Sequence, residues 1–291
     1  MDAMGTAGAV GHGPSRYPRP MMDLHEVARH EERRCAQGMA TISPESRPFA
    51  GGFACRDAPG NWSNTILGAG FDEPVDPAAL DEVIAWYEAA GIEPRAEVAP
   101  FVDRSFIELL AERRFVVRVF ENVFFRELSP AEKVRPPTPL DVGIHVVTVD
   151  RDDAAAVRDC GLAVAKGFAL DPSAPDPLDV ELSERVMRQA GVVTVAARCD
   201  GRYIGAGSMD VTTPAAALFG LSVLPEFRRR GVQLALIAAR LNEAAKLGCR
   251  LATVGARPGV ATERNARRMG FQVGYTKVAM VRPGPGLTPV R

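Results

Sequence analysis

The sequence contains little that would support extracellular, metal or membrane chemistry. Its five cysteines are odd in number, lie far apart and form no C-x-x-C pair, which argues against a disulfide framework and against a zinc site. No apolar run reaches the roughly 20 residues that span a bilayer, and no basic-then-apolar leader opens the chain. The net charge is −1 at pH 7, so no broad attraction to nucleic acid or to an anionic membrane exists. We therefore expect a cytoplasmic protein that holds no metal ion and binds neither nucleic acid nor a membrane.

Several motifs of nucleotide-binding and hydrolytic proteins are also missing. No G-x-x-x-x-G-K-[ST] occurs, no G-x-G-x-x-G stands between a strand and a helix, and no serine-centred nucleophile elbow is present. His25 and His30 are separated by five residues, which on a helix places them on different faces and excludes the zinc motif of two histidines four apart. These absences exclude the common phosphate-loop, dinucleotide-binding and serine-hydrolase classes.

A proline-rich stretch, 129–142, divides the chain into halves of similar size. Its prolines withhold backbone donors and disfavour helix, as in a linker. Before this linker, the sequence predicts a disordered tail rich in Gly, Ala and Pro (1–22) and an N-terminal domain (23–128). After it, the sequence predicts a C-terminal domain (143–282) and a short C-terminal tail (283–291).

The C-terminal half shows a clear alternation of elements. Asp200-Gly201 joins two strand-like runs and predicts a hairpin, because glycine accepts a positive φ without steric cost. Gly248 is a natural stop for the long apolar helix before it. The predicted order is helix 152–168, helix 178–190, strands 192–198, 203–209 and 215–223, helix 234–248, strand 250–256, helix 261–269 and strand 271–281.

The N-terminal half repeats part of this order. Strands are predicted over 51–59, 64–71, 94–100 and 115–128, with helices over 77–91 and 103–114. A strand, a crossover helix and a strand imply a parallel pair within an otherwise antiparallel sheet. The sequence thus predicts an α/β (α+β) fold of two similar domains, each a mixed, mostly antiparallel sheet flanked by helices.

The segment 221–233, LSVLPEFRRRGVQ, carries the chemistry. An apolar strand ends at Pro225, a basic turn follows, and a long helix begins near Gly231. The first amides of a helix lack intrahelical partners and lie at the positive end of its dipole, so they bind phosphate. Glycine at position 231 lets a pyrophosphate approach the backbone closely. A solvated basic turn that caps an ordinary helix is the structural alternative.

This segment resembles the acetyl-CoA motif of the GNAT acetyltransferases, V-x-P-x-x-[RQ]-x-x-G-x-[GA]. Val223, Pro225, Arg228 and Gly231 match, while Gln233 replaces the usual small residue. The resemblance runs from the hairpin near residue 192 to Gly270-Phe271. It implies that backbone groups near Ser222 and Val223 bind the pantetheine arm, and that the turn cradles the pyrophosphate. The cofactor-binding residues implied for that turn are Arg228, Arg229, Arg230, Gly231, Val232, Gln233 and Leu234.

The last helix departs from the family pattern. Many members carry N-x-x-A-x-x-[LF]-Y there, with the tyrosine as acid toward the leaving thiolate, but Gly259 and Ala266 occupy the asparagine and tyrosine positions. Thr262 and Asn265 are candidates to hold the cofactor instead, or are ordinary polar helix residues. Tyr275 is the candidate acid, with a half-buried strand tyrosine as the alternative.

Two further expectations concern the acceptor and the N-terminal half. Glu181, Glu184 and Asp210 are candidate bases for the acceptor amine, or ordinary surface carboxylates. The turn Asp72 to Pro77 stands where the N-terminal half would need its basic glycine turn, and its acidic residues would repel an anion. We expect that half to be a degenerate copy that supports the fold or the acceptor pocket.

The resemblance implies an acetyl-CoA-dependent N-acetyltransferase that acts on a small-molecule or peptide amine. Two alternatives remain open, namely a transferase of another acyl group and a catalytically silent CoA-binding sensor. Turnover distinguishes the sensor from a transferase, because a sensor binds acetyl-CoA without releasing thiol in the presence of amines.

Overall fold

The computed structural model describes residues 23–130 and 132–290, which form seven α-helices and one 11-stranded sheet. The helices are α1 Leu24–Ile42, α2 Pro77–Glu88, α3 Arg104–Glu112, α4 Ala154–Phe168, α5 Pro177–Met187, α6 Val232–Lys246 and α7 Ala261–Arg268. The strands are β1 Glu45–Phe49, β2 Gly52–Arg56, β3 Thr65–Leu67, β4 Arg95–Val98, β5 Val116–Glu127, β6 Ile144–Thr148, β7 Val192–Cys199, β8 Arg202–Thr212, β9 Ala215–Val223, β10 Leu251–Ala256 and β11 Gln272–Val281.

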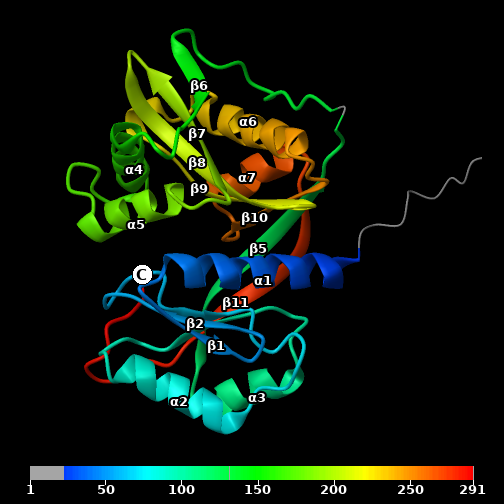
Figure 1. Cartoon of the computed structure of the whole chain (residues 1–291), viewed down its shortest axis with the longest axis vertical. Helices are drawn as coiled ribbons and strands as arrows, with labels where there is room; N and C mark the ends of the chain where they lie inside the picture. The colour runs from blue at the N-terminus through cyan, green and yellow to red at the C-terminus, as the bar shows by residue number, and fades with distance from the viewer. Residues whose placement is uncertain (1–22, 131, 291) are drawn as a thin grey trace, which may run out of the picture.

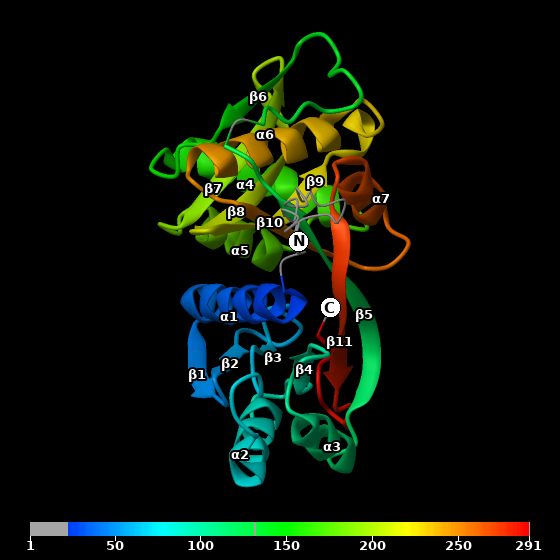
Figure 2. The same cartoon turned by 90° about the vertical axis from the view of Figure 1, so that its right-hand side faces the viewer.

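The two halves of the chain exchange strands. The sheet order is β1-β2-β3-β4-β11-β5-β10-β9-β8-β7-β6, so β5 of the N-terminal half lies between β10 and β11 of the C-terminal half. β11 in turn pairs with β4, Val278 opposite Val98. Figure 2 shows β5 and β11 running side by side from one half of the molecule into the other. The mixed, mostly antiparallel sheet confirms the predicted fold class, but one continuous sheet replaces the two separate sheets.

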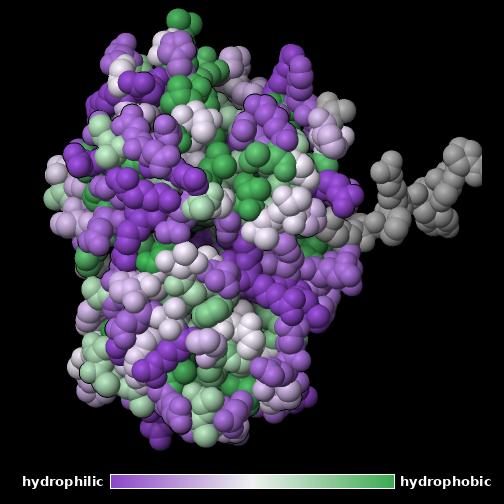
Figure 3. Space-filling model, viewed as in Figure 1, coloured by the Kyte–Doolittle hydropathy of each residue, from purple (hydrophilic) through white to green (hydrophobic). Residues whose placement is uncertain are grey.

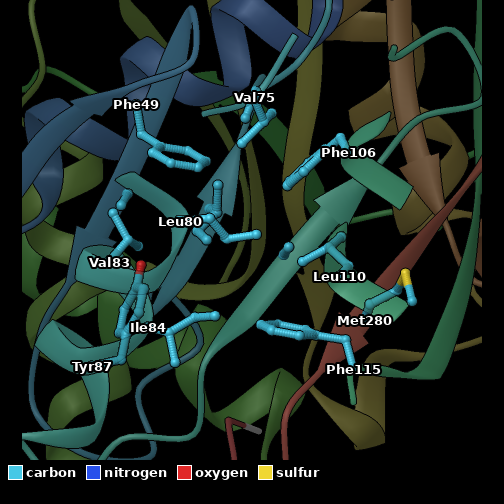
Figure 4. Packing of buried hydrophobic residues seen from close by; sticks show 14 of the residues in the cluster. Phe49, Val75, Leu80, Val83, Ile84, Tyr87, Phe106, Leu110, Phe115 and Met280 are labelled. Atoms are coloured by element: carbon cyan, nitrogen blue, oxygen red, sulfur yellow. The ribbon is translucent and has the colours of Figure 1, made fainter. Parts of the chain in front are cut away.

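Helices cover both faces of this sheet. In the N-terminal half, α2 and α3 bury apolar side chains against the sheet in a core that includes Leu80, Tyr87, Phe106 and Met280 (Figure 4). In the C-terminal half, α6 and α7 cover one face, while α4 packs against β8 and β9 on the other. Met280 belongs to the last strand, so the N-terminal core is complete only when β11 joins it.

Helix α1 lies across the waist of the molecule, between the two halves (Figure 1). It packs on β2, β3 and β11 and also contacts α5. The sequence-based prediction missed this helix because its buried face contains two glutamates, Glu31 and Glu32, beside Val27, Ala28 and Ala36. Charged residues at buried positions interrupt the apolar stripe by which an amphipathic helix is recognised.

The linker and the C-terminal tail are both anchored. The side-chain amide of Asn242 on α6 accepts from the Val134 amide at 2.8 Å and donates to the Val134 carbonyl at 2.9 Å. The backbone of Thr288 exchanges hydrogen bonds with Gly91 and Glu93, which ties 282–290 to the N-terminal half. The predicted tail 1–22 lies outside the described residues. Within the described part of the chain, no helix is long and apolar enough to cross a membrane.

Candidate functional site

Strands β9 and β10 begin as a parallel pair and then part. They pair from Ala215 opposite Leu251 to Leu218 opposite Val254, and no pairing continues beyond that point. A register shift lies in β9 at Gly220, which has a φ of 61°. Between the diverging strands lies a cavity of about 130 Å³, which we call the split cavity. It is lined by Phe168, Leu218, Phe219, Gly220, Leu221, Ile237, Arg240, Val254, Gly255, Thr262, Ala266 and Phe271.

Helix α6 follows β9 and starts without a side-chain cap. Its N-cap is Gly231, in the left-handed region with a φ of 77°, and no side chain bonds to the first amides. Helices α1 to α5 differ, because an aspartate caps each of them. The amides of Val232, Gln233 and Leu234 therefore have neither intrahelical nor side-chain partners, which leaves the positive end of this helix uncapped.

The three arginines of the turn have different surroundings. Arg228 points back into the fold, where its guanidinium donates to the carbonyls of Val223 at 3.1 Å and Gly167 at 2.8 Å. Arg229 has a φ of 64°, and Arg230 stacks over the ring of Phe227 at 5.3 Å. Arg228 thus fixes the turn against β9 and α4, and although all three arginines are exposed, Arg229 and Arg230 provide charge that is not used in this way.

Other predicted cofactor-binding residues also find protein partners. The hydroxyl of Ser222 donates to the Val164 carbonyl at 2.9 Å, which ties β9 to α4. The side-chain amide of Asn265 donates to Oε1 of Gln233 at 2.7 Å, which joins α7 to α6 across the end of the split. Thr262 lines the split cavity directly. Of this predicted set, Thr262 is thus the side chain placed at the split itself.

The corresponding helix start in the N-terminal half is already filled. The carboxylate of Asp76 accepts from the amides of Ala78 and Ala79 at the start of α2, each at 3.3 Å. Asp72 forms ion pairs with Arg29 and Arg33 of α1. A carboxylate of the chain itself thus holds the position that an external anion would take.

Arg240 is the only charged residue among those that line the split cavity. It lies on α6, is 1% exposed, and donates to the carbonyls of Ser208 at 2.9 Å, Phe219 at 3.3 Å and Leu236 at 3.2 Å. Burial lowers the pKa of Arg240 to about 9, so the side chain is cationic at neutral pH. A buried cation with only neutral partners favours nearby negative charge.

A much larger cavity of about 1340 Å³ lies between the two halves. We call it the interdomain cavity. α1 forms much of its wall, together with residues of β4, β5, β8 and β11, and Phe219 lines both this cavity and the split cavity. Hydrophilic side chains gather over the waist where the first turns of α1 lie (Figure 3). Nε2 of His30 and Nε of Arg95 in its wall are buried without a hydrogen-bond partner in the described chain.

Buried charges beside this cavity hold the halves together. Arg34 of α1 forms ion pairs with Glu31 at 2.8 Å and with Asp210 of β8 at 3.1 Å. Burial by itself raises the pKa of Glu31, but the Arg34 guanidinium and the hydrogen bond from Thr253 outweigh it and the pKa falls to about 2. Lys277 of β11 forms a second pair with Glu97 at 2.8 Å.

Tyr275, the predicted acid, lies below this surface. It is 5% exposed, donates its hydroxyl to Glu32 at 2.6 Å, and lines neither cavity. Burial and the neighbouring Glu32 carboxylate raise its pKa well above the ordinary value. This placement argues against proton donation, and the catalytic role of Tyr275 stays a prediction.

The predicted bases are dispersed, and a carboxylate that was not predicted lies closer to the split. Glu181 and Glu184 pair with arginines on α5 and line neither cavity. Asp210 lines the interdomain cavity but is paired with Arg34. Glu121 of β5 lines the same cavity, and burial raises its pKa. No local signal in the sequence distinguishes Glu121, because strand exchange alone brings it to the site.

Residues 163–271 match the model of the acetyltransferase (GNAT) family. No curated protein is similar enough in sequence to count as a relative.

Solved structures share the fold at low sequence identity. A GCN5-related N-acetyltransferase from Kribbella flavida is 19% identical with a TM-score of 0.66, over 90% of this chain and 97% of that one. A tandem GNAT protein from the clavulanic acid biosynthesis pathway is 14% identical with a TM-score of 0.59, over 93% and 91%. A GCN5-related N-acetyltransferase from Sphaerobacter thermophilus is 17% identical with a TM-score of 0.55, over 82% and 81%.

Proposed function

We propose that the protein is an acetyl-CoA-dependent N-acetyltransferase for a small-molecule or peptide amine, because residues 163–271 match the model of the acetyltransferase (GNAT) family. One observation carries the proposal. The parallel strands β9 and β10 part after Leu218 and Val254, and the glycine-capped start of α6 lies next along the chain from β9. An extended arm with a diphosphate at its end fits such a split and such a helix start.

Different parts of the chain around the split would bind different parts of the cofactor. Amides from Arg229 to Leu234 would hold the pyrophosphate, and backbone groups near Ser222 and Val223 would hold the pantetheine arm. When bound, acetyl-CoA supplies an acetyl group activated as a thioester. Arg240 would stabilise the negative charge that develops as the sulfur leaves, a role that the family often gives to a tyrosine missing here.

The interdomain cavity would receive the acceptor. It shares Phe219 with the split cavity, so an amine held there lies next to the end of the split. The buried and unpartnered His30 Nε2 and Arg95 Nε in its wall are suited to polar groups of an acceptor. Both halves of the chain contribute to this cavity.

The N-terminal half would be a degenerate copy of the same fold. The order β2-β3-α2-β4-α3-β5 parallels β8-β9-α6-β10-α7-β11, and β3 and β4 form a parallel bridge, Ile66 opposite Ala96. Asp76 fills the helix start that would otherwise bind a phosphate. This half would bind no CoA and would provide a wall of the acceptor cavity.

Calorimetric titration of acetyl-CoA into wild type, Gly231→Glu and Gly248→Glu tests the cofactor site. Both glycines lie at ends of α6 with φ of 77° and 85°, so both variants carry backbone strain, while a Cβ at position 231 would also meet the Pro139 carbonyl oxygen at 2.7 Å. Only the first places a carboxylate at the proposed phosphate site. We expect Gly231→Glu to abolish binding and Gly248→Glu to bind as the wild type does.

Thiol release across an amine panel then tests the reaction. Release that depends on the amine supports the transferase. A wild type that binds acetyl-CoA but turns over no amine would instead be a silent sensor, and turnover only with other acyl-CoA esters would assign another acyl group. A wild type that does not bind acetyl-CoA would contradict the proposal as a whole.

A further inference from the structure

Glu121 lines the interdomain cavity and lies against Gly255, a residue of the split cavity. It belongs to β5, the strand that the N-terminal half places between β10 and β11, and its side chain lines the interdomain cavity. On β10, Gly255 lines the split cavity and pairs with Val123, two residues from Glu121 on the same face of β5. The Glu121 side chain therefore extends diagonally across β10 toward the split.

Gly255 makes room for this carboxylate. A Cβ at position 255 would collide with Oε1 of Glu121. The backbone of Gly255 has no positive φ that would by itself require glycine, so the space taken by the carboxylate is the visible reason for a glycine here. The carboxylate thus rests against a strand that forms one wall of the split.

The Glu121 carboxylate is also free to accept a proton. Among the described residues no side chain donates a hydrogen bond to it. Burial raises its pKa, Lys277 directly opposite on β11 lowers it, Glu97 and Glu32 raise it, and Arg95 lowers it. Lys277 itself forms an ion pair with Glu97, so Glu97 and Glu121 share its positive charge. A carboxyl group with a raised pKa and no fixed partner is suited to accept a proton.

We propose that Glu121, which strand exchange brings into the C-terminal sheet, is the base that deprotonates the acceptor amine in the interdomain cavity. The acceptor is then a primary amine that enters as an ammonium ion. This inference rests on the proposed acetyltransferase function. It gives the N-terminal half a direct part in a reaction whose cofactor is held by the other half.

The proton balance is simple. The ammonium gives one proton to the Glu121 carboxylate, which later passes it to water in the cavity. The neutral nitrogen forms the new C–N bond as the C–S bond breaks, and the sulfur leaves with the bonding electron pair as a thiolate. The second proton lost by the nitrogen neutralises that thiolate, so the products are the acetamide and free CoA thiol.

The test compares four proteins: wild type, Glu121→Gln, Gly255→Ala and Glu127→Gln. Glu127 lies on the same strand, is exposed and lines neither cavity, so its variant removes an equal charge outside the proposed acceptor site. Gly255→Ala keeps the carboxylate but displaces it by the new methyl group. Thiol release is measured from pH 6 to 10 with the panel amine that wild type acetylates fastest, and acetyl-CoA affinity is measured by calorimetry.

We expect Glu121→Gln to lower kcat by about 100-fold or more near neutral pH, with unchanged acetyl-CoA affinity. Activity should recover as pH rises and the free amine deprotonates itself. Gly255→Ala should lower kcat at least about 10-fold, and Glu127→Gln should resemble wild type. If Glu121→Gln does not fold, which loss of acetyl-CoA binding would show, the kcat of Gly255→Ala tests the inference instead.

Wild-type turnover and an unchanged pH profile in Glu121→Gln, or in Gly255→Ala if that variant decides, overturn the inference and leave the acetyltransferase function intact. A wild type that acetylates no amine of the panel overturns the proposed function first, without reference to any Glu121 variant, and removes this inference with it.

Discussion

Tyr275 on the last strand donates its hydroxyl to Glu32 on the first helix at 2.6 Å, and both side chains are buried. This hydrogen bond joins β11 to α1 and so links the two ends of the described chain. Together with the pair Lys277–Glu97 and the contact of Thr253 with Glu31, it forms a buried polar layer beneath the interdomain cavity. A fully connected layer of this kind fixes one arrangement of the strands above it.

This arrangement predicts that Tyr275→Phe affects stability more than catalysis. Loss of a hydrogen bond to a buried carboxylate should lower the free energy of unfolding by about 1–3 kcal/mol. Turnover at saturating acetyl-CoA should stay within about threefold of wild type, because the hydroxyl lines neither cavity. Urea unfolding and thiol release measure the two effects. Turnover that falls by about 100-fold while stability is unchanged would restore Tyr275 as the acid.

Glu31 predicts a dependence of stability on acid. Its folded-state pKa of about 2 lies below the ordinary value of 4.5, so the ionised form is stabilised by folding. That contribution is present above the unfolded pKa and is lost as pH falls from about 4.5 through 2. The difference in unfolding free energy between wild type and Glu31→Gln should shrink by about 3 kcal/mol over this range, since one pKa unit is about 1.4 kcal/mol. Chemical unfolding of both proteins at several pH values measures this difference, and a difference that does not change with pH would contradict it.

Removing the partner of Glu31 should cost more. Arg34→Met leaves a buried carboxylate without its cation, which typically destabilises a protein by about 3–5 kcal/mol. It also breaks the pair with Asp210 and so loosens α1 from β8. Equal stability of Arg34→Met and wild type in urea unfolding at pH 7 would contradict this account.

Arg240→Met should slow the reaction without weakening cofactor binding. The buried guanidinium is the one cation among the described residues that line the split cavity, and loss of one such stabilising group often lowers kcat by about 100-fold. The exposed Arg264 on α7 supplies a matched control as Arg264→Met, which should leave kcat unchanged. Stopped-flow thiol release and acetyl-CoA calorimetry give both quantities. Equal kcat in the two variants would remove Arg240 from the mechanism.

Strand exchange predicts that the C-terminal half does not fold alone. A fragment of residues 129–291 lacks β5, so β10 and β11 would lose the strand that joins them. We expect little cooperative unfolding by circular dichroism from this fragment. Addition of a fragment of residues 23–128, which carries β5, should restore a cooperative transition. A stable fragment 129–291 on its own would show that the exchange is not needed for folding.

Much of the C-terminal half could be predicted because its signals are local. The Asp200-Gly201 hairpin, the helix start at Gly231 and the helix stop at Gly248 each depend on backbone preferences of a few adjacent residues. Observed helix α6, Val232–Lys246, lies within two residues of its predicted bounds. The proposed cofactor turn could be predicted for the same reason, since its expected chemistry resides in consecutive backbone amides.

Tertiary structure alone decided which side chains reach the two cavities. Helix α1 has glutamates on its buried face, so no apolar stripe predicts it, and only its ion pairs with β8 and β11 explain its burial. Glu121 is one charged residue in an otherwise ordinary strand until β5 lies beside β10 and Gly255 leaves space for its carboxylate. The sequence by itself determined which turn we propose for phosphate binding, because that prediction depends on neighbours along the chain. The tertiary structure decided which carboxylate we propose as the base, because that depends on residues more than 100 positions apart that only the exchanged strands bring together.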